Sequence, residues 1–474
     1  MSKLLPNLPI ENLTTKNDYI GIIEKGTLLK SFFLNNKDEF SEIKIFSIYG
    51  EWGSGKSTLM KYLERELKGS FNTFFFESWE FESDENLSLS LLETLTKNTG
   101  SITDGFIKNA NKLLEGFAKS VTFKTPIVNI NAEKIIEEVD KISFLELKEK
   151  FKSDFINWEN KITEGDKSPD YNIVFIDDLD RCEPENILNL LSAMKLFFTY
   201  GKKTIFLCGI DKKAIREAVK TKYGEIVKAN EYLEKVFDIS FSMPESVDTS
   251  KLVHQYFGED EMFGDEKLGD LISAFFDDLH FKNPRRIKKI LNKYLIIKMM
   301  QSNVDFDDYL IPNIINNEKG TLFETYLTLY LLILKEFEPE NFKLLFDLTY
   351  KRINYTTAIG KKVTENNEFK NAVNSNLIHL KEDRINRSLD EDDMRSVKGF
   401  NSIVAFFSPR EIDQLDGYAF IGADEFSEKV GTSKKSYEYY FTIFILKNKT
   451  KIIKEFESIS LSLLDYKKMI SNLI

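Results

Sequence analysis

The sequence of 474 residues contains only two cysteines, Cys182 and Cys208, and only three histidines. A disulfide framework needs more cysteines than this, and cysteine alone cannot supply the four ligands of a structural zinc site. The histidines show no paired metal-binding spacing. Glycine and proline are also scarce, with 22 and 10 residues, which excludes a collagen-like or mostly disordered chain.

A long hydrophobic run is missing as well. No stretch of 18 apolar residues occurs, so the sequence predicts no transmembrane helix. The first six residues, MSKLLP, lack the extended apolar core of a secretory signal. We therefore expect a cytoplasmic protein in a reducing compartment.

Positive charge is not in excess. The chain has 65 Lys and Arg residues against 76 Asp and Glu residues, a net charge of −11. Nucleic-acid binding usually depends on a basic excess that contacts phosphates, so this balance disfavours such a partner but leaves room for a local basic groove. Phenylalanine, by contrast, is abundant at 40 residues and supplies ample side chains for a buried core.

Short apolar segments alternate with helical patterns in the first half of the chain. Continuous apolar runs are typical of parallel strands that are covered on both faces. Their alternation with helices predicts an α/β fold, a parallel sheet with helices on both faces. The expected strands are 44–50, 72–81, 171–177, 203–210 and 235–243, and the clearest helices are 57–68 and 184–199.

The chain length suggests about three domains. We predict that residues 1–245 form the α/β domain, with a helical insertion or lid at about 87–170 that is too long for a plain crossover. Residues 246–350 are expected to form a helical domain. Its segment TYLTLYLLIL is too short to span a membrane, which favours a buried bundle helix. Residues 351–474 are expected to be mainly helical, with no assigned role.

The segment between Gly50 and Ser57 reads GEWGSGKS and matches the phosphate-binding pattern G-x-x-x-x-G-K-[ST]. It follows an apolar strand and opens an amphipathic helix, the context that this pattern requires. Its backbone N–H groups and the helix start would face the phosphates. Lys56 is expected to reach the β- and γ-phosphates, and Ser57 to bind Mg²⁺. The predicted nucleotide-binding residues here are Gly50, Trp52, Gly53, Ser54, Gly55, Lys56, Ser57 and Thr58.

A second motif of the expected site is an acidic pair, Asp177 and Asp178, which directly follows the apolar segment IVFI. This is a Walker B pattern, in which Asp177 would hold the Mg²⁺ shell. Asp178 is interpreted as the acid that polarises the attacking water, with capping of the next helix as the alternative. Arg181 has two interpretations that the sequence leaves open: a surface ion pair, or a contact with a phosphate or a neighbouring subunit.

Two further elements are candidates for the same site. Asp211, after the strand at 203–210, would sense the γ-phosphate or the water, or else cap the helix that starts near Lys212. The segment NPRRIKKILN at 283–292 predicts the start of a basic helix, whose Arg285 would reach back to the nucleotide. Contact with nucleic acid, or a solvated helix face, are the alternatives.

Together these segments resemble the KAP family of P-loop NTPases, over about residues 1–300. The resemblance implies an ATPase domain similar to AAA+ and STAND proteins, with an additional strand between the two Walker strands. Family members often carry transmembrane helices in their insertion, and this chain departs from them there. Bacterial members often occur near phage-defence genes, which implies a defence role. The matching stretches are IYGEWGSGKST, FESWEF, IVFIDDLDRCEPENILNLLSAMKLFF, IFLCGID, EYLEKVFDISFSMP and NPRRIKKILN.

The expected function is Mg²⁺-dependent binding and hydrolysis of ATP, which switches conformation or assembly. The guanine-recognition motif N-K-x-D of GTPases does not occur at the required distance after the loop, which favours adenine over guanine nucleotides. We expect a homo-oligomer, or a partner protein bound through the helical regions. Two alternatives remain: a nucleotide-gated binding or scaffold protein with little turnover, and a DNA- or RNA-associated ATPase.

Overall fold

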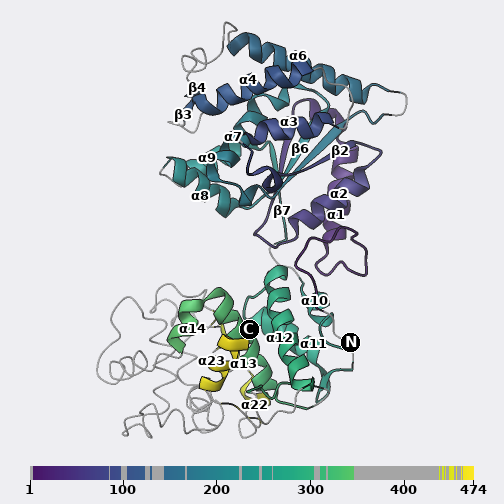
Figure 1. Ribbon diagram of the computed structural model, residues 1–474. Helices are drawn as coiled ribbons and strands as arrows, with labels where there is room; N and C mark the ends of the chain where they lie inside the picture. The colour runs from purple at the N-terminus through teal and green to yellow at the C-terminus, as the bar shows by residue number, and fades with distance from the viewer. Residues whose placement is uncertain are drawn as a thin grey trace. The chain divides into compact units, whose positions relative to one another are not determined.

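The chain forms two compact units in the computed structural model (Figure 1). One unit spans Leu8–Val247, and the other combines Asp248–Ile474 with Met1–Asn7. The predicted domain boundaries, at residues 245 and 350, both lie outside the described residues. The structure describes residues 4–84, 86–97, 104–122, 129–130, 144–165, 168–223, 227–244, 248–258, 260–303, 310–316 and 319–345, and part of 437–473.

A five-stranded sheet forms the centre of the first unit, with strand order β2-β5-β6-β1-β7. All four strand pairs are parallel. Every residue of β1, β5 and β6 is buried, as continuous apolar strands require. The predicted α/β class is confirmed, and β6 is the additional strand between β1 and β5. The strands are β1 Ile45–Tyr49, β2 Asn72–Glu77, β5 Asn172–Asp177, β6 Thr204–Ile210 and β7 Ile239–Ser242.

The two edge strands are shorter than predicted. The segment expected at 72–81 leaves the sheet at Glu77 and continues as the 3₁₀ turn η2, Ser78–Phe81. The segment expected at 235–243 is a strand only in β7, because helix α9, Val227–Val236, extends through its first residues. The buried side chains there follow a helical spacing rather than an alternating one. They are Tyr232, Leu233, Val236 and Phe237.

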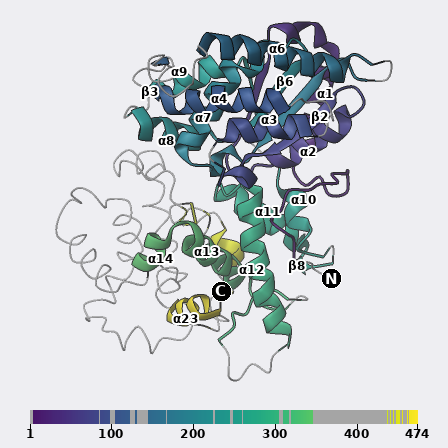
Figure 2. The same cartoon turned by 45° about the horizontal axis from the view of Figure 1, so that its top comes forward.

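The alternation of side chains along the strands builds one hydrophobic core on each face of the sheet. Ile173 and Phe175 of β5 pack with α1 and α2, whereas Val174 and Ile176 pack on the opposite face. Figures 1 and 2 show α3 and α7 away from α1 and α2 across the sheet. These helices are α1 Ile22–Asn35, α2 Lys56–Leu67, α3 Leu87–Lys97 and α7 Pro184–Leu196, and the helix that follows β6 is α8 Lys212–Tyr223.

The expected helical insertion between β2 and β5 is present and packs against the sheet domain. Buried Glu159 ties it to the start of β6, where the backbone N–H groups of Lys202 and Lys203 donate to its carboxylate at 2.7 and 2.8 Å. Phe151 lies in the same buried cluster as the α7 side chains. The described elements are α3, α4 Asp104–Ser120, the hairpin β3 Val121–Thr122 and β4 Asn129–Ile130, and α6 Phe144–Thr163.

The second unit is helical and is built around α13, Leu322–Phe337. Its residues from Leu322 to Leu334 are all buried, which confirms the expected bundle helix. Glu324 of α13 accepts a hydrogen bond from the hydroxyl of Tyr466 at 2.9 Å and so holds the last helix in place. Among the described residues, none of the helices combines the length and apolar character that crossing a membrane requires. The other elements are α10 Ser250–His254, β8 Met262–Phe263, β9 Glu266–Lys267, α11 Leu268–Asp278, α12 Pro284–Asn303, α14 Pro339–Leu345, α22 Lys449–Ile452 and α23 Leu463–Leu473.

Candidate functional site

The loop after β1 has the geometry of a phosphate-binding loop. Gly53 and Gly55 have φ angles of 84° and 98°, in the left-handed region that favours glycine. A Cβ atom at Gly55 would also lie 2.8 Å from the Cδ1 of buried Ile22. Lys56 is only 6% exposed, and its Nζ donates to the carbonyls of Gly50 at 2.8 Å and Glu51 at 3.2 Å. The loop therefore closes around the ammonium group at the start of α2.

Asp177 lies at the end of β5, beside the helix that follows this loop. It is 4% exposed, and burial raises the pKa of its carboxyl, while a hydrogen bond with the Ser57 hydroxyl acts in the opposite direction. Gly209 of β6 leaves room for this carboxylate, since a Cβ there would lie 2.9 Å from Asp177 Oδ1. A carboxylate beside a hydroxyl provides the oxygen ligands that Mg²⁺ prefers.

Asp178 lies in a constrained turn directly after the strand. Its φ of 57° is unusual for a residue with a side chain, and such strain often occurs at functional sites. Burial, and then the charge of Asp177, raise the pKa of Asp178 to about 6. Arg181 Nη2 lies 3.1 Å from Asp178 Oδ1, and its guanidinium lies 5.0 Å from the ring centre of Trp79. Arg181 therefore forms an ion pair, which is one of its two predicted roles. The other role, a contact with a phosphate or a neighbouring subunit, stays a prediction.

Asp211 links the phosphate-binding loop to the helix after β6. Its Oδ1 accepts a hydrogen bond from the Lys213 backbone N–H at 2.8 Å, which is the capping role given as its alternative. Its Oδ2 accepts another from the Trp52 backbone N–H at 3.1 Å. A second link that the sequence analysis missed is the ion pair between Lys213 and Glu51, at 2.6 Å. The sensor role of Asp211 stays a prediction.

Two other predicted site residues contact the N-terminal segment. Thr58 directly follows Ser57 and was predicted to bind nucleotide. Its hydroxyl accepts a hydrogen bond from the Ile10 backbone N–H at 3.1 Å. Arg285 belongs to the second unit, where its Nη2 donates to the Asn7 carbonyl at 3.1 Å. Neither contact was foreseen, and a nucleotide contact of either residue stays a prediction.

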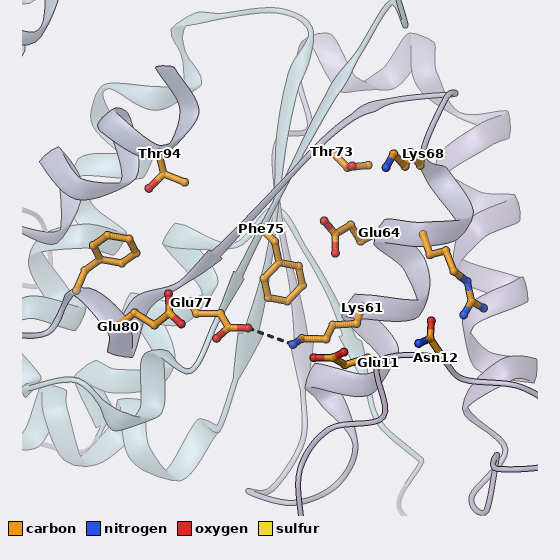
Figure 3. A pocket seen from close by; sticks show the side chains of 12 residues that line it. Glu11, Asn12, Lys61, Glu64, Lys68, Thr73, Phe75, Glu77, Glu80 and Thr94 are labelled. Carbon is orange, nitrogen blue, oxygen red and sulfur yellow. Dashed lines mark ion pairs between the residues drawn. The ribbon is translucent and has the colours of Figure 1, made fainter. Parts of the chain in front are cut away.

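Glu77 is a polar residue at the same edge of the sheet that the sequence analysis did not select. It lies opposite Asp177 in the register between β2 and β5. Its carboxylate is 3.2 Å from Lys61 Nζ of α2, and Figure 3 shows this ion pair. The pair lines a groove of 680 Å³ whose wall includes Phe75. A polar residue at the end of an apolar strand was the available signal, the same one that marks Asp177.

Comparisons with known proteins identify relatives of this chain. A family model described as the KAP family P-loop domain matches residues 33–300. An uncharacterised protein of Methanocaldococcus jannaschii is 42% identical over 112 residues, which cover 22% of this chain and 44% of that protein, so the chain spans less than half of it. Another from the same organism is 31% identical over 170 residues, which cover 28% of this chain and 88% of that protein.

Among solved structures, a Walker-type ATPase of Pyrococcus abyssi matches 78% of this chain and 91% of its own, at 12% sequence identity and a TM-score of 0.31. This similarity is too low to support an argument about the site. The family match is different, since it covers more than half of the sequence and includes both Walker segments. The chain belongs to the KAP family of P-loop NTPases.

Proposed function

We propose that the protein binds ATP together with Mg²⁺ at the loop before α2 and hydrolyses it. One observation carries this proposal: the buried Asp177 carboxylate lies against the Ser57 hydroxyl, at the helix start that also presents Lys56. Ser57 and Asp177 would hold the metal ion, whose positive charge would stabilise the charge that develops on the phosphates. Lys56 would leave the loop carbonyls to contact the β- and γ-phosphates.

Asp178 is proposed to polarise the attacking water. It follows Asp177 directly, and its turn places it at the same edge of the sheet. Its Oδ1 is paired with Arg181, so a water would have to use the other carboxylate oxygen, or the pair would have to loosen. We therefore propose that Arg181 affects turnover through its ion pair with Asp178 and does not contact the phosphate.

The hydrolysis would serve as a switch of conformation or assembly. The sequence has a full nucleotide site but no second recognisable catalytic motif, which supports a switch over the conversion of a metabolite. The helical second unit would bind a second copy or a partner protein. A cytoplasmic location and a role in anti-phage defence are further proposals, and the latter rests on the family resemblance alone.

The test is phosphate release from ATP and Mg²⁺ by the full chain, beside Lys56→Ala. Removal of a preorganised charge from a water-excluded phosphate site should lower turnover by about 100-fold or more. Lys68→Ala is the matched control, because Lys68 lies exposed at the far end of α2 and should leave turnover unchanged. Tight, Lys56-dependent ATP binding without turnover would contradict hydrolysis and favour the nucleotide-gated scaffold.

A further inference from the structure

The N-terminal segment is anchored to α12 through its backbone. The Leu5 N–H donates to Asn292 Oδ1 at 3.0 Å, and Asn292 Nδ2 donates back to the Leu5 carbonyl at 2.8 Å. One side-chain amide thus bonds both polar groups of a residue, as a neighbouring strand would. The Tyr256 hydroxyl donates to the same Oδ1 at 3.0 Å and fixes the orientation of the amide.

Two basic residues of the same helix extend this anchor. Lys288 Nζ donates to the Pro6 carbonyl at 3.4 Å, and Arg285 Nη2 donates to the Asn7 carbonyl at 3.1 Å. Residues 285, 288 and 292 share one face of a helix, because three or four residues make one turn. Three side chains therefore bond the three successive carbonyls of Leu5, Pro6 and Asn7. These hydrogen bonds use cationic groups for which contact with nucleic acid was one of the alternative predictions.

The next residues of the same segment are held on α2, within the first unit. The Ile10 N–H donates to the Thr58 hydroxyl at 3.1 Å, and Arg65 Nη2 donates to the Leu13 carbonyl at 3.1 Å. Leu13 is 2% exposed and belongs to the core beneath α2. This part of the segment is therefore fixed to the helix whose first turn carries Lys56 and Ser57.

Only Leu8 and Pro9 separate the two anchored parts. The Cα atoms of Asn7 and Ile10 are three peptide units apart, so they cannot separate by more than about 11 Å. Proline further restricts the backbone of this short link. A change in the first turn of α2 would therefore have to pass only two residues of backbone to reach the anchor on α12.

We infer that residues 5–13 form a strap that couples nucleotide binding at the start of α2 to the helical unit, with Asn292, Lys288 and Arg285 as its anchor. The inference rests on the proposed function only in taking ATP as the ligand. Binding of phosphates would act on the first turn of α2, and Thr58 in that turn bonds Ile10 directly. The strap would carry this change along its backbone to Leu5.

The first test is hydrogen exchange at the Leu5 and Ile10 amides of the full chain, with and without a non-hydrolysable ATP analogue and Mg²⁺. The analogue should change exchange at Leu5 by threefold or more. Asn292→Ala removes both Leu5 hydrogen bonds, so Leu5 exchange without nucleotide should rise by about tenfold. Coupling is reciprocal, so this variant should also change the dissociation constant of the analogue.

Two further variants keep this test decisive. Leu5→Pro removes the donor on the strap itself and leaves every residue of α12 unchanged, and it should change the dissociation constant in the same direction. Lys289→Ala is the control on the same helix, because Lys289 pairs with Glu336, and it should leave Leu5 exchange as in the unmodified protein.

The outcomes separate this inference from the proposed function. Lys56-dependent binding of the analogue without any change at Leu5 would overturn the strap and leave the proposed nucleotide site standing. Unchanged dissociation constants in both Asn292→Ala and Leu5→Pro would also overturn it. Failure of the unmodified protein to bind the analogue would overturn the proposed function itself, and the inference with it.

Discussion

The helices α2 and α12 both carry basic residues in their first turn, yet they differ in how the backbone amides of that turn are bonded. At α12 the Asn283 side chain accepts hydrogen bonds from the backbone N–H groups of Arg285 and Arg286, at 3.1 and 3.2 Å. At α2 the residue before the helix is Gly55, which has no side chain to cap it. The first-turn amides of α2 remain available to an anion, whereas those of α12 are already bonded.

The comparison shows that a basic helix start is not by itself a phosphate site. The cations at the two helices make similar contacts, since Lys56 donates to the carbonyls of its own loop and Arg285 to that of Asn7. What differs is the loop before the helix: glycines with positive φ at α2, and an Asn-Pro cap at α12. Four variants test or sharpen this contrast.

The largest effect is expected for Gly55→Ala. Its φ of 98° and the nearby Ile22 side chain leave no room for a Cβ, so ATP affinity should fall by about 100-fold or more and stability by about 2 kcal/mol. Gly69→Ala is the matched control, because Gly69 has a φ of 91° but no atom within 4 Å of the added Cβ. It should lose about 1 kcal/mol and keep its ATP affinity. Titration with an ATP analogue and urea unfolding measure both, and equal affinity losses would contradict the proposed loop geometry.

The next effect is expected for Asp177→Asn. Loss of the carboxylate should lower Mg²⁺-dependent turnover by about 100-fold or more. Burial raises the pKa of Asp177, so its ionised form destabilises the fold at neutral pH. Without nucleotide the free energy of unfolding of the neutral variant should therefore be higher by about 1 kcal/mol, measured by urea unfolding. A variant that retains full turnover, or is less stable, would contradict this assignment.

A smaller effect is expected for Asn283→Ala at the other helix. Loss of the cap should destabilise the helical unit by about 1 kcal/mol, which thermal unfolding would detect. The freed amides of α12 should not create a phosphate site, because the convergent glycine loop is missing there. Increased binding of inorganic phosphate by this variant, measured by calorimetry, would show that the cap alone distinguishes the two helices.

The smallest effect is expected for Lys213→Ala. Its ion pair with Glu51 is 2.6 Å long, but both side chains are more than half exposed. Water screens such pairs, so stability should change by less than about 0.5 kcal/mol, measured by urea unfolding. A larger loss would mean that this pair, and not only Asp211, holds the phosphate-binding loop in place.

Much of the fold could be predicted because its signals are local. The apolar strands β1, β5 and β6 are fully buried, and α2 ends at Leu67, one residue before the predicted end at residue 68. The start of β7 was misplaced because a helical segment with closely spaced apolar residues resembles a strand over a few positions. Edge strands are also harder to delimit, since only one side of them is paired.

The candidate site divides in the same way. Lys56, Ser57 and Asp177 could be selected because their motifs combine strict spacing with a strand or helix on one side. The hydrogen-bond and ion-pair partners of Thr58, Arg181 and Asp211 could not be selected in this way. A hydroxyl, a guanidinium or a carboxylate can bond to many different groups, and the fold selects among them. Asp211 illustrates this, since the cap of α8 was one of its two predicted roles, whereas the hydrogen bond from Trp52, 159 positions away, was not predicted.

The sequence by itself determined the strand, glycine loop and helix of the P-loop and the buried acid at the end of β5. These follow from short-range sterics and from apolar periodicity, which act within a few residues. Only the tertiary structure decided that Arg181 pairs with Asp178 over Trp79, and that Arg285, Lys288 and Asn292 of α12 hold the N-terminal segment. Leu5 and Asn292 are 287 positions apart, and packing of the whole chain is what brings two such groups within hydrogen-bonding distance.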